Sequence, residues 1–506
     1  MSEPQGAPPR PKTAMLSRHW KLAVLAAAGF ATVIGTTTTV EANEGRTSEA
    51  TPATRATSPK GAEGKGTEGK GDEGREKGDK GKGGKGDHGK ADKAGRTDKG
   101  DRDEYGHHGD DDTTYVECDP NDLIANLVDL NSDAGGTLVL AKDCTYTLTV
   151  NEDGNGLPTI TQPITIRGNG ATIQRAANAD AFRLFDVGSG GDLKLSHLTL
   201  TRGTTVEDEA GAAIRVSPAG RVDLDCVTVT RNAVGDLENA DAGGVFNEGI
   251  LTIRNSTLSK NAGEDGAAVY NDGGKVEITD SRITGNTSDD SDGYAAVYSE
   301  GGGTLKVSRS LVAYNYAYYG GGIYSSFDGN GATTTVIDRS AVVYNHAAFG
   351  GGIYGDDGTL VVRDSTVAYN TTSGEGEGTG GGGFYLERNV STVITDSKVH
   401  ANTAANGNGG GILTELNEGS VLAIRDSKVS GNQAPGNGAM GGGIFVGEGD
   451  EVRLTDTKVT GNISDEPAGG IHNLGAITAY GKTKIVDNVP TNCQAIGTNP
   501  VPNCFG

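Results

Sequence analysis

The chain has 506 residues, of which 82 are glycine, and only 5% of its residues are aromatic. A compact α/β enzyme of this length usually carries fewer glycines and more large apolar side chains, so the composition argues against that class. The formal net charge is −23, and residues 113–506, with 25 basic and 48 acidic residues, hold the whole excess. Such a surface repels nucleic acid and anionic membranes, and it favours cations, basic partners or neutral sugars.

Residues 1–42 have the features of a secretory signal peptide. Four basic residues precede an apolar run over residues 22–35, and Val40-Glu41-Ala42 offers a small-residue cleavage site. The run is short for a membrane-spanning helix, although an uncleaved anchor is the alternative. We therefore expect a secreted or cell-surface protein with no membrane-spanning segment after removal of the signal.

Residues 43–112 consist mainly of Gly, Lys, Asp and Glu and contain almost no apolar side chains. Such a segment cannot bury enough apolar surface to offset the entropy lost on ordering, so it is predicted to be a disordered spacer. Its glycines do not recur at every third position, which excludes a collagen helix.

Five cysteines fit an oxidising destination. Cys118 and Cys144 flank one short unit, and Cys493 and Cys504 flank another near the end of the chain. We expect one disulfide in each unit. Cys226 is left over, at a repeat position that Asp or Asn usually fills, and is predicted to be a semi-buried free thiol.

An internal repeat dominates residues 136–490. Its most regular member is an asparagine that recurs at intervals of 25 to 32 residues, at Asn232, Asn261, Asn286, Asn315, Asn345, Asn370, Asn402, Asn432, Asn462 and Asn488. Apolar residues lie three and eight positions before each Asn, Ser or Thr lies five before most of them, and a run of small residues ending in an apolar one follows.

This pattern predicts three short strands per unit, with the apolar positions facing inward. One unit cannot bury its inner face alone, whereas stacked coils bury a continuous column of like residues. The recurring Asn suits a turn, because its side chain bonds backbone groups and it tolerates a left-handed φ.

Two stretches resemble known families. The Gly-Gly-x-Ile/Val runs followed by Val-x-Gly-Asn or Val-Ala-Tyr-Asn resemble the repeats of polymorphic outer-membrane proteins, with Val, Leu or Ile in place of their Phe. Residues 164–173 resemble an early coil of pectate-lyase-like β-helices. The resemblance covers about Val116 to Asn488 and implies an all-β, right-handed parallel β-helix of roughly 10–12 coils.

The resemblance also implies a cap at the N-terminal end, and the second cysteine pair predicts one at the C-terminal end. Asp119-Pro120 followed by Leu123, Ile124, Leu127 and Val128 predicts a capped amphipathic helix, which within residues 113–135 would close the N-terminal end. Residues 491–506 are expected to form a disulfide-closed C-terminal cap. Because this fold hosts lyases, hydrolases, adhesins and spikes, the resemblance implies no single function.

Two columns of side chains are predicted to face outward from the solenoid. The aromatic column comprises Tyr270, Tyr298, Tyr324, Tyr354 and Tyr385, and it is a candidate glycan contact if these strands face outward and core if they do not. The carboxylate column, two residues further on, comprises Glu248, Asp272, Glu300, Asp356, Glu387 and Glu415. A second aromatic patch comprises Tyr314, Tyr344 and Tyr369, each directly before a repeat Asn.

The carboxylate column raises the question of a bound cation. Neighbouring charges about 4.8 Å apart repel each other, so bound Ca²⁺ is one hypothesis. A solvated acidic edge that keeps the solenoid soluble is the alternative.

Asp356 and Asp357 form the one outward acidic pair predicted at a strand end near aromatic residues, and they are the candidates for catalysis. Asp356 merely continues a regular column, however, whereas catalytic sites usually interrupt a repeat. We therefore predict an adhesin-like β-helix protein that binds an extracellular glycan or a cell-surface partner. An extracellular polysaccharide lyase or glycoside hydrolase is the alternative.

Overall fold

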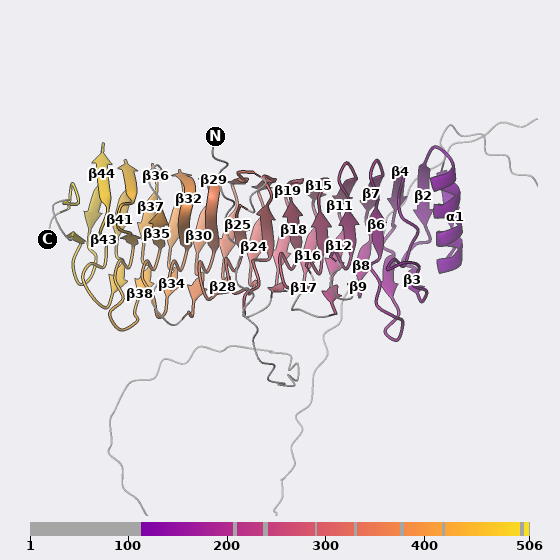
Figure 1. Cartoon of the computed structure of the whole chain (residues 1–506), viewed down its shortest axis with the longest axis horizontal. Coiled ribbons are helices and arrows are strands. Elements are labelled where there is room, and N and C mark those ends of the chain that lie inside the picture. The colour runs from indigo at the N-terminus through magenta and orange to yellow at the C-terminus, as the bar shows by residue number, and fades with distance from the viewer. Residues whose placement is uncertain are drawn as a thin grey trace, which may run out of the picture. The chain divides into compact units, whose positions relative to one another are not determined.

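The computed structural model describes residues 113–205, 210–235, 241–288, 291–327, 331–374, 379–416, 420–495 and 500–504. They form a parallel β-solenoid of about 11 turns, as predicted (Figure 1). The expected signal peptide and spacer, residues 1–42 and 43–112, lie outside the described residues and stay predictions. No helix in the described ranges is long and apolar enough to cross a membrane.

The helix α1 (Pro120–Ser132) lies against the first coil (Figure 1). Asp119 caps it by accepting a hydrogen bond of 2.8 Å from the backbone N–H two residues later. Leu123 and Leu127 are completely buried in the interior core. Val128 was predicted on the same face but is 48% exposed, because five residues after Leu123 the helix has rotated it away. The helix thus covers the N-terminal end of the core.

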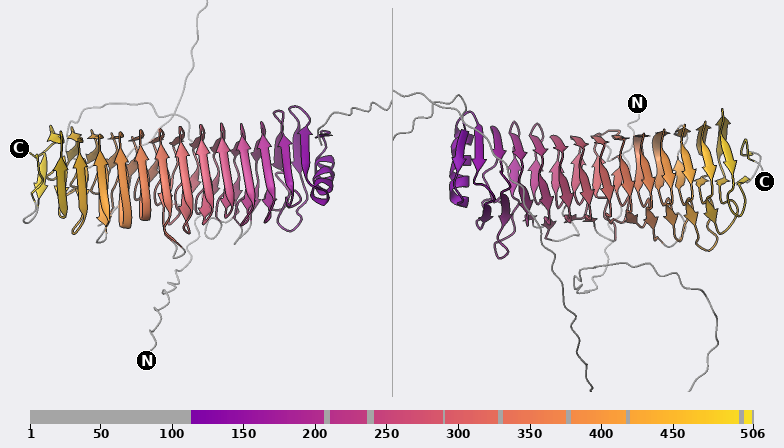
Figure 2. Two further views of the ribbon diagram at one scale, coloured as in Figure 1. Left: turned by 90° about the horizontal axis from the view of Figure 1, so that it is seen from above. Right: turned by 180° about the vertical axis from the view of Figure 1, so that it is seen from behind.

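Each regular coil contributes one strand to each of three faces (Figures 1 and 2). The first face contains β6 (Phe185–Val187), β10 (Ile214–Val216), β14 (Val245–Asn247), β18 (Val269–Asp272), β22 (Val297–Glu300), β25 (Ile323–Ser325), β29 (Ile353–Arg363), β32 (Phe384–Thr395), β35 (Ile412–Leu416), β39 (Ile444–Val446), β43 (Ile471–Asn473) and β46 (Cys493–Ala495).

The second face contains β1 (Thr113–Val116), β2 (Gly136–Leu140), β4 (Pro163–Arg167), β7 (Asp192–Ser196), β11 (Arg221–Asp225), β15 (Ile250–Arg254), β19 (Lys275–Thr279), β23 (Thr304–Ser308), β26 (Thr334–Asp338), the second halves of β29 and β32, β36 (Val421–Arg425), β40 (Glu451–Thr455) and β44 (Ala476–Tyr480). Because β29 and β32 run from the first face to the second without a break, these two faces form one 24-stranded sheet.

The third face is a separate sheet of 13 strands. It contains β3 (Thr145–Leu148), β5 (Thr172–Arg175), β8 (Thr199–Thr201), β12 (Thr228–Thr230), β16 (Thr257–Ser259), β20 (Arg282–Thr284), β24 (Leu311–Ala313), β27 (Ala341–Val343), β30 (Thr366–Ala368), β33 (Lys398–His400), β37 (Lys428–Ser430), β41 (Lys458–Thr460) and β45 (Lys484–Val486).

Short two-residue strands follow the third face in two further ladders. These are β9 (Thr204–Thr205), β13 (Ala233–Val234), β17 (Ala262–Gly263) and β21 (Thr287–Ser288), then β28 (His346–Ala347), β31 (Thr371–Thr372), β34 (Thr403–Ala404), β38 (Gln433–Ala434) and β42 (Ile463–Ser464).

The coils stack in register, so each interior column contains one kind of side chain. Ile253 pairs with Ile278, and Ile278 pairs with Val307, all three fully buried. The predicted period-two alternation is therefore confirmed: every second residue of a strand enters the single long core.

The repeated asparagines form a buried ladder inside the solenoid rather than occupying the left-handed turn position predicted for them. The Oδ1 atom of Asn345 accepts hydrogen bonds from the backbone N–H (3.1 Å) and the Nδ2 (2.9 Å) of Asn315. Its own Nδ2 donates to the carbonyl of Val312 and to Oδ1 of Asn370, both at 3.0 Å. The left-handed residue is the one before each Asn, for example Tyr344 (φ 57°). Asn is required here for its donor and acceptor, not for its backbone freedom.

Both predicted disulfides are present, Cys118–Cys144 and Cys493–Cys504. Cys226 is free, as expected, but exposed rather than semi-buried. It occupies a left-handed turn (φ 56°), which directs its side chain away from the interior. The proposed domain limits of 113–135, 136–490 and 491–506 stay predictions, although β1 and β46 already pair with the sheet inside the two expected caps.

Substituting Asn345 by Ala tests the ladder. The change leaves the backbone N–H of Asn315 and the carbonyl of Val312 buried without these partners, so the free energy of unfolding should fall by about 3 kcal/mol. Chemical denaturation measures this loss. Lys428→Ala, at an exposed position of β37, is the control and should change stability by less than about 0.5 kcal/mol. Equal stability of the two variants would show that the ladder is dispensable.

Candidate functional site

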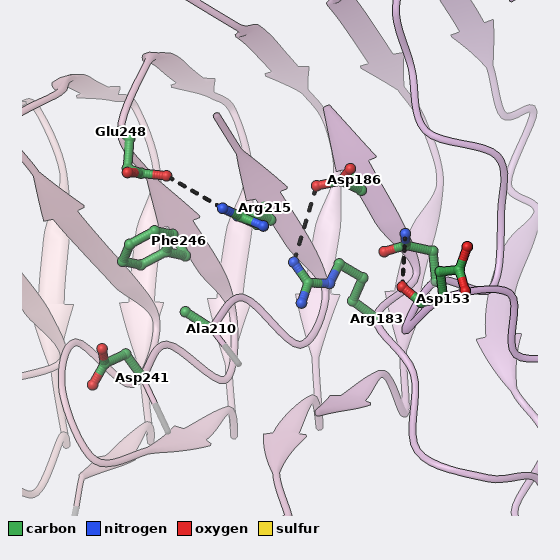
Figure 3. Close-up of a pocket in the computed structure, with 9 residues that line it drawn as sticks. Asp153, Arg183, Asp186, Ala210, Arg215, Asp241, Phe246 and Glu248 are labelled. Carbon is green, nitrogen blue, oxygen red and sulfur yellow. Dashed lines mark hydrogen bonds and ion pairs between the residues drawn. The ribbon is translucent and has the colours of Figure 1, made fainter. Parts of the chain in front are cut away.

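A polar groove with a volume of about 370 Å³ lies over the outer surface of β6, β10 and β14 (Figure 3). Four carboxylates, two arginines and one aromatic ring dominate its lining. The complete lining is Asp153, Asn155, Arg183, Asp186, Ala210, Arg215, Asp241, Phe246 and Glu248. We call this site the polar groove.

Strand register places the central groove residues in one outward column of the first face. Asp186 on β6 pairs with Arg215 on β10, which pairs with Phe246 on β14. Phe246 in turn pairs with Tyr270, where the predicted aromatic column begins. The groove therefore lies where charged residues interrupt the aromatic column.

Arginine–carboxylate pairs cross the groove at long range. Arg183 Nη1 lies 4.0 Å from Asp186 Oδ1, and Arg215 Nη2 lies 3.8 Å from Glu248 Oε2 (Figure 3). These separations exceed hydrogen-bond distance. Asp186 Oδ1, Glu248 Oε2 and Asn155 Oδ1 are buried atoms that accept no hydrogen bond from the described residues. Because buried polar atoms in native proteins normally have partners, these three oxygens are acceptors that a bound ligand could use.

Carboxyl groups with raised pKa values stand at the Phe246 end of the groove. Burial, followed by the nearby charges of Glu300 and Asp272, raises the pKa of Asp241 to about 6. Burial, followed by the charge of Asp241, also raises the pKa of Asp265 well above its ordinary value. Asp241 therefore holds its proton into the weakly acidic range.

The five tyrosines predicted as a glycan contact stack in register and point away from the interior core, but they are only 4–8% exposed. The expectation that their rings lie open to solvent is wrong. They pack in a second apolar cluster with Tyr294, Tyr319 and Phe349, which come from the segments preceding the small-residue runs. One such contact is the stack of Tyr294 on Tyr324, with ring centroids 4.8 Å apart. Glycan contact by Tyr270, Tyr298, Tyr324, Tyr354 and Tyr385 stays a prediction that requires these segments to move.

The carboxylate column of Glu248, Asp272, Glu300, Asp356, Glu387 and Glu415 runs beside the tyrosines as predicted, and tyrosine hydroxyls donate to four of its six members. Tyr385 donates to Glu415 at 2.7 Å, and Tyr354 donates to Glu387. Glu300 accepts from Tyr298 at 2.5 Å. These bonds relieve the repulsion that motivated the calcium hypothesis. Among the described residues, no group of three or more His, Cys, Asp or Glu side chains is placed to hold a metal ion. Calcium binding stays a prediction.

The acidic pair considered for catalysis is not exposed as expected. Asp356 is 1% exposed. It accepts hydrogen bonds from Nε and Nη2 of Arg388 and from the hydroxyl of Tyr324, the last at 3.1 Å. Asp357 accepts from Asn389 Nδ2 at 2.6 Å. These contacts serve the packing of successive coils, because every partner of Asp356 lies on a neighbouring coil.

Sequence reasoning missed Asp186, Arg215 and Asp241. Extending the aromatic column backwards by one and two coils from Phe246 leads to Arg215 and then Asp186. This break in a regular column was the available signal. Asp241 had no such signal, because it lies before a small-residue run, where the residue type varies between coils.

Comparison with known proteins gives one family match. A family model described as a right-handed beta helix region matches residues 212–489. No curated protein matches the sequence. The A-module of mannuronan C-5 epimerase AlgE6 from Azotobacter vinelandii is 14% identical, with 74% of this chain and 96% of that chain covered and a TM-score of 0.42. PfbA, a surface adhesin of Streptococcus pneumoniae, is 12% identical, with coverages of 73% and 93% and a TM-score of 0.32.

Asp241→Asn tests the electrostatics at the Phe246 end of the groove. The folded state binds its proton up to pH about 6 and the unfolded state only to about pH 4, so the wild type loses stability as the pH rises through this window. The variant lacks this loss. The melting temperature of the variant minus that of the wild type should therefore be larger at pH 7.5 than at pH 4. Asp426→Asn, at an exposed turn, should give the same difference at both pH values.

Proposed function

The chain belongs to the family of proteins with a right-handed beta helix region, and on this premise we propose that it is an extracellular binding protein whose polar groove holds a carbohydrate. The observation that carries the proposal is the groove itself, a cavity of about 370 Å³ whose lining side chains include buried oxygens without hydrogen donors. The volume falls within the range typical of small-molecule sites.

The chemistry of the groove suits a polyhydroxylated ligand. Sugar hydroxyls donate hydrogen bonds, which Asp186 and Glu248 are able to accept once their side chains turn toward a ligand. Arg183 and Arg215 supply N–H groups for the hydroxyl oxygens. Phe246 adds an apolar surface for the less polar side of a sugar ring. Acceptors, donors and an apolar plate within one cavity are the components that carbohydrate recognition needs.

A glycoside hydrolase or polysaccharide lyase is the second candidate, and Asp241 is the observation that favours it. With a pKa of about 6, this carboxyl is partly protonated near neutral pH, as a general acid has to be. Glu248 and Asp186 supply further carboxyl groups in the same groove. Hydrolysis of a glycosidic bond employs such a pair, one acidic and one acting as base or nucleophile.

Retention on immobilised polysaccharides tests the binding function, with galactomannan, xylan and soluble starch as neutral polymers and polygalacturonate as the acidic one. The purified chain should be retained by at least one neutral polymer. Glu248→Gln and Asp186→Asn should each weaken this retention about tenfold, the effect of losing one hydrogen bond to a charged group. Glu451→Gln, whose ion pair with Arg453 lies far along the second face, is the matched control.

The same incubations distinguish the two candidates. Retention without new chain ends supports binding alone, whereas release of new ends that Asp241→Asn abolishes supports the enzyme. Calcium and a chelator are included as separate arms, because a calcium-dependent melting temperature would support the cation hypothesis for the carboxylate column. Retention of no polymer, or retention that survives both groove substitutions, would contradict the proposal.

A further inference from the structure

A second exposed surface lies on the third face, over β24, β27 and β30. We call it the Arg–Tyr strip. Two arginines border it on one side and three tyrosines on the other, with short side chains between them. Its members are Arg309, Arg339, Leu311, Ala341, Thr366, Tyr314, Tyr344 and Tyr369.

The arginines replace a residue type that the turn favours. The left-handed residue before the third face is Asn255, Asp280, Asp364, Asp396, Asp426 or Asp456 in other coils. Asn and Asp tolerate this conformation better than other residues with a β-carbon. Arg309 and Arg339 adopt it as well, both with φ of 48°. Two successive coils thus carry a positive residue at a turn that most other coils fill with Asn or Asp.

The tyrosines occupy the left-handed turn after the third face, where Gly285, Gly431 and Gly461 stand in other coils. Tyr314, Tyr344 and Tyr369 are 64%, 45% and 44% exposed. Their rings stack with centroids 5.1 and 4.8 Å apart and interplanar angles of 3° and 6°. They thus form a continuous stack of parallel rings, the tyrosine plate, whose faces lie mainly against one another and whose outer edges face solvent, unlike the buried tyrosines of the first face. A structural role would be met by glycine, which this turn accepts elsewhere.

The side chains between the arginines and the tyrosines are shorter than those at the two borders. Leu311, Ala341 and Thr366 stack in register at the centre of the strip, whereas the same column continues with lysines from Lys398 onwards. A cavity of about 540 Å³ lies over this floor. Its charged lining consists of three arginines, Arg282, Arg309 and Arg339, and two aspartates, Asp280 and Asp364. The cavity is therefore locally positive on a chain with a net charge of −23.

Existing ion pairs orient both border guanidiniums without using all their donors. Arg309 donates through Nε and Nη2 to the two oxygens of Asp280, both at 2.8 Å. Arg339 donates through Nε (2.9 Å) and Nη2 (2.6 Å) to Asp338. No hydrogen bond from either Nη1 to a described residue is present. The remaining N–H groups of two oriented guanidiniums in successive coils suit an oxyanion whose oxygens point in several directions.

We propose that the Arg–Tyr strip binds a sulfated glycan, with the sulfate between Arg309 and Arg339 and a sugar ring against the tyrosine plate. A tetrahedral sulfate presents oxygens to both guanidiniums at once, whereas a planar carboxylate is matched by a single fork, as Asp280 already shows. The three-residue strand between the borders spans roughly 10 Å. That distance requires an oligosaccharide rather than a single sugar.

The acidic remainder of the protein does not prevent this binding. At physiological ionic strength the Debye length is about 8 Å, so charges on the distant first face are largely screened at the strip. The site is also independent of the polar groove, which lies on the first face and lacks an aromatic plate of this kind. Failure of one proposal therefore leaves the other intact.

Three polymers with one backbone test the strip: dextran sulfate, carboxymethyl dextran and uncharged dextran. The full chain should bind dextran sulfate at least tenfold more tightly than either of the others, measured by surface plasmon resonance at physiological salt. Equal binding of carboxymethyl dextran would overturn the assignment to sulfate. Binding of none, or equal binding of uncharged dextran, would overturn the site.

The variant Arg309→Asn/Arg339→Asn removes both forks and restores a residue that the turn accepts at Asn255. Arg363 still pairs with Asp338 at 2.8 Å, so the melting temperature should not fall. Binding of dextran sulfate should weaken at least tenfold. Lys458→Gln/Lys484→Gln removes the same charge from the third face several coils away and should leave binding unchanged. Equal losses in both variants would mean general electrostatic attraction and would overturn the proposal.

The tyrosine plate has its own test in Tyr314→Gly/Tyr344→Gly/Tyr369→Gly, which places at each position the residue that other coils carry there. The variant should lose most of its affinity for dextran sulfate. Inorganic sulfate, followed as a competitor of a short fluorescent sulfated oligosaccharide on the wild type, should compete weakly, because it engages the arginines alone. Unchanged polymer affinity in the tyrosine variant would overturn the sugar-ring contact. Glu248→Gln should leave all these values unaltered, which separates the strip from the polar groove.

Discussion

In-register stacking of coils is the constraint on which the rest of this structure depends, and the buried asparagine ladder enforces it. From Asn261 to Asn488, each asparagine oxygen accepts from the main chain and the side chain of the asparagine one coil earlier. A shift of register by one residue would expose apolar side chains and also leave these buried groups without partners. Burial of apolar side chains alone would favour stacking without fixing one register. The hydrogen bonds of the asparagine ladder select a single alignment of neighbouring coils.

A solenoid aligned in this way separates two kinds of position. Inward residues are tied to their column, because each contacts equivalents above and below. Outward residues are free to vary, so a column that stays regular carries little information about binding. The polar groove and the Arg–Tyr strip both lie where an outward column changes character, at Asp186 and Arg215 on the first face and at Arg309 and Arg339 on the third.

The first-face tyrosines show how regularity and burial reinforce each other. Their hydroxyls donate to carboxylates on the same or the next coil, and the segments before the small-residue runs cover their rings. The carboxylates of this column would repel one another as a bare row of charges. Hydrogen bonds from the tyrosines instead make them part of one hydrogen-bonded layer. Desolvation and the adjacent carboxylates raise the pKa of Tyr298, Tyr354 and Tyr385 well above its ordinary value, so the hydroxyls remain donors.

Sequence alone determined the parallel β-helix, the approximate number of coils, the capping helix and both disulfides, because repetition and residue spacing are local properties of the chain. It also identified which residues share a column, including Tyr314, Tyr344 and Tyr369. The resemblance to polymorphic outer-membrane repeats stays a prediction. Tertiary structure decided which outward columns reach solvent: it buried Tyr270 to Tyr385 and Asp356, and it assembled the groove from residues up to 95 positions apart, Asp153 to Glu248. The exposure of an outward side chain depends on which loops of neighbouring coils cover it. The periodicity of the repeat does not predict the path of these loops.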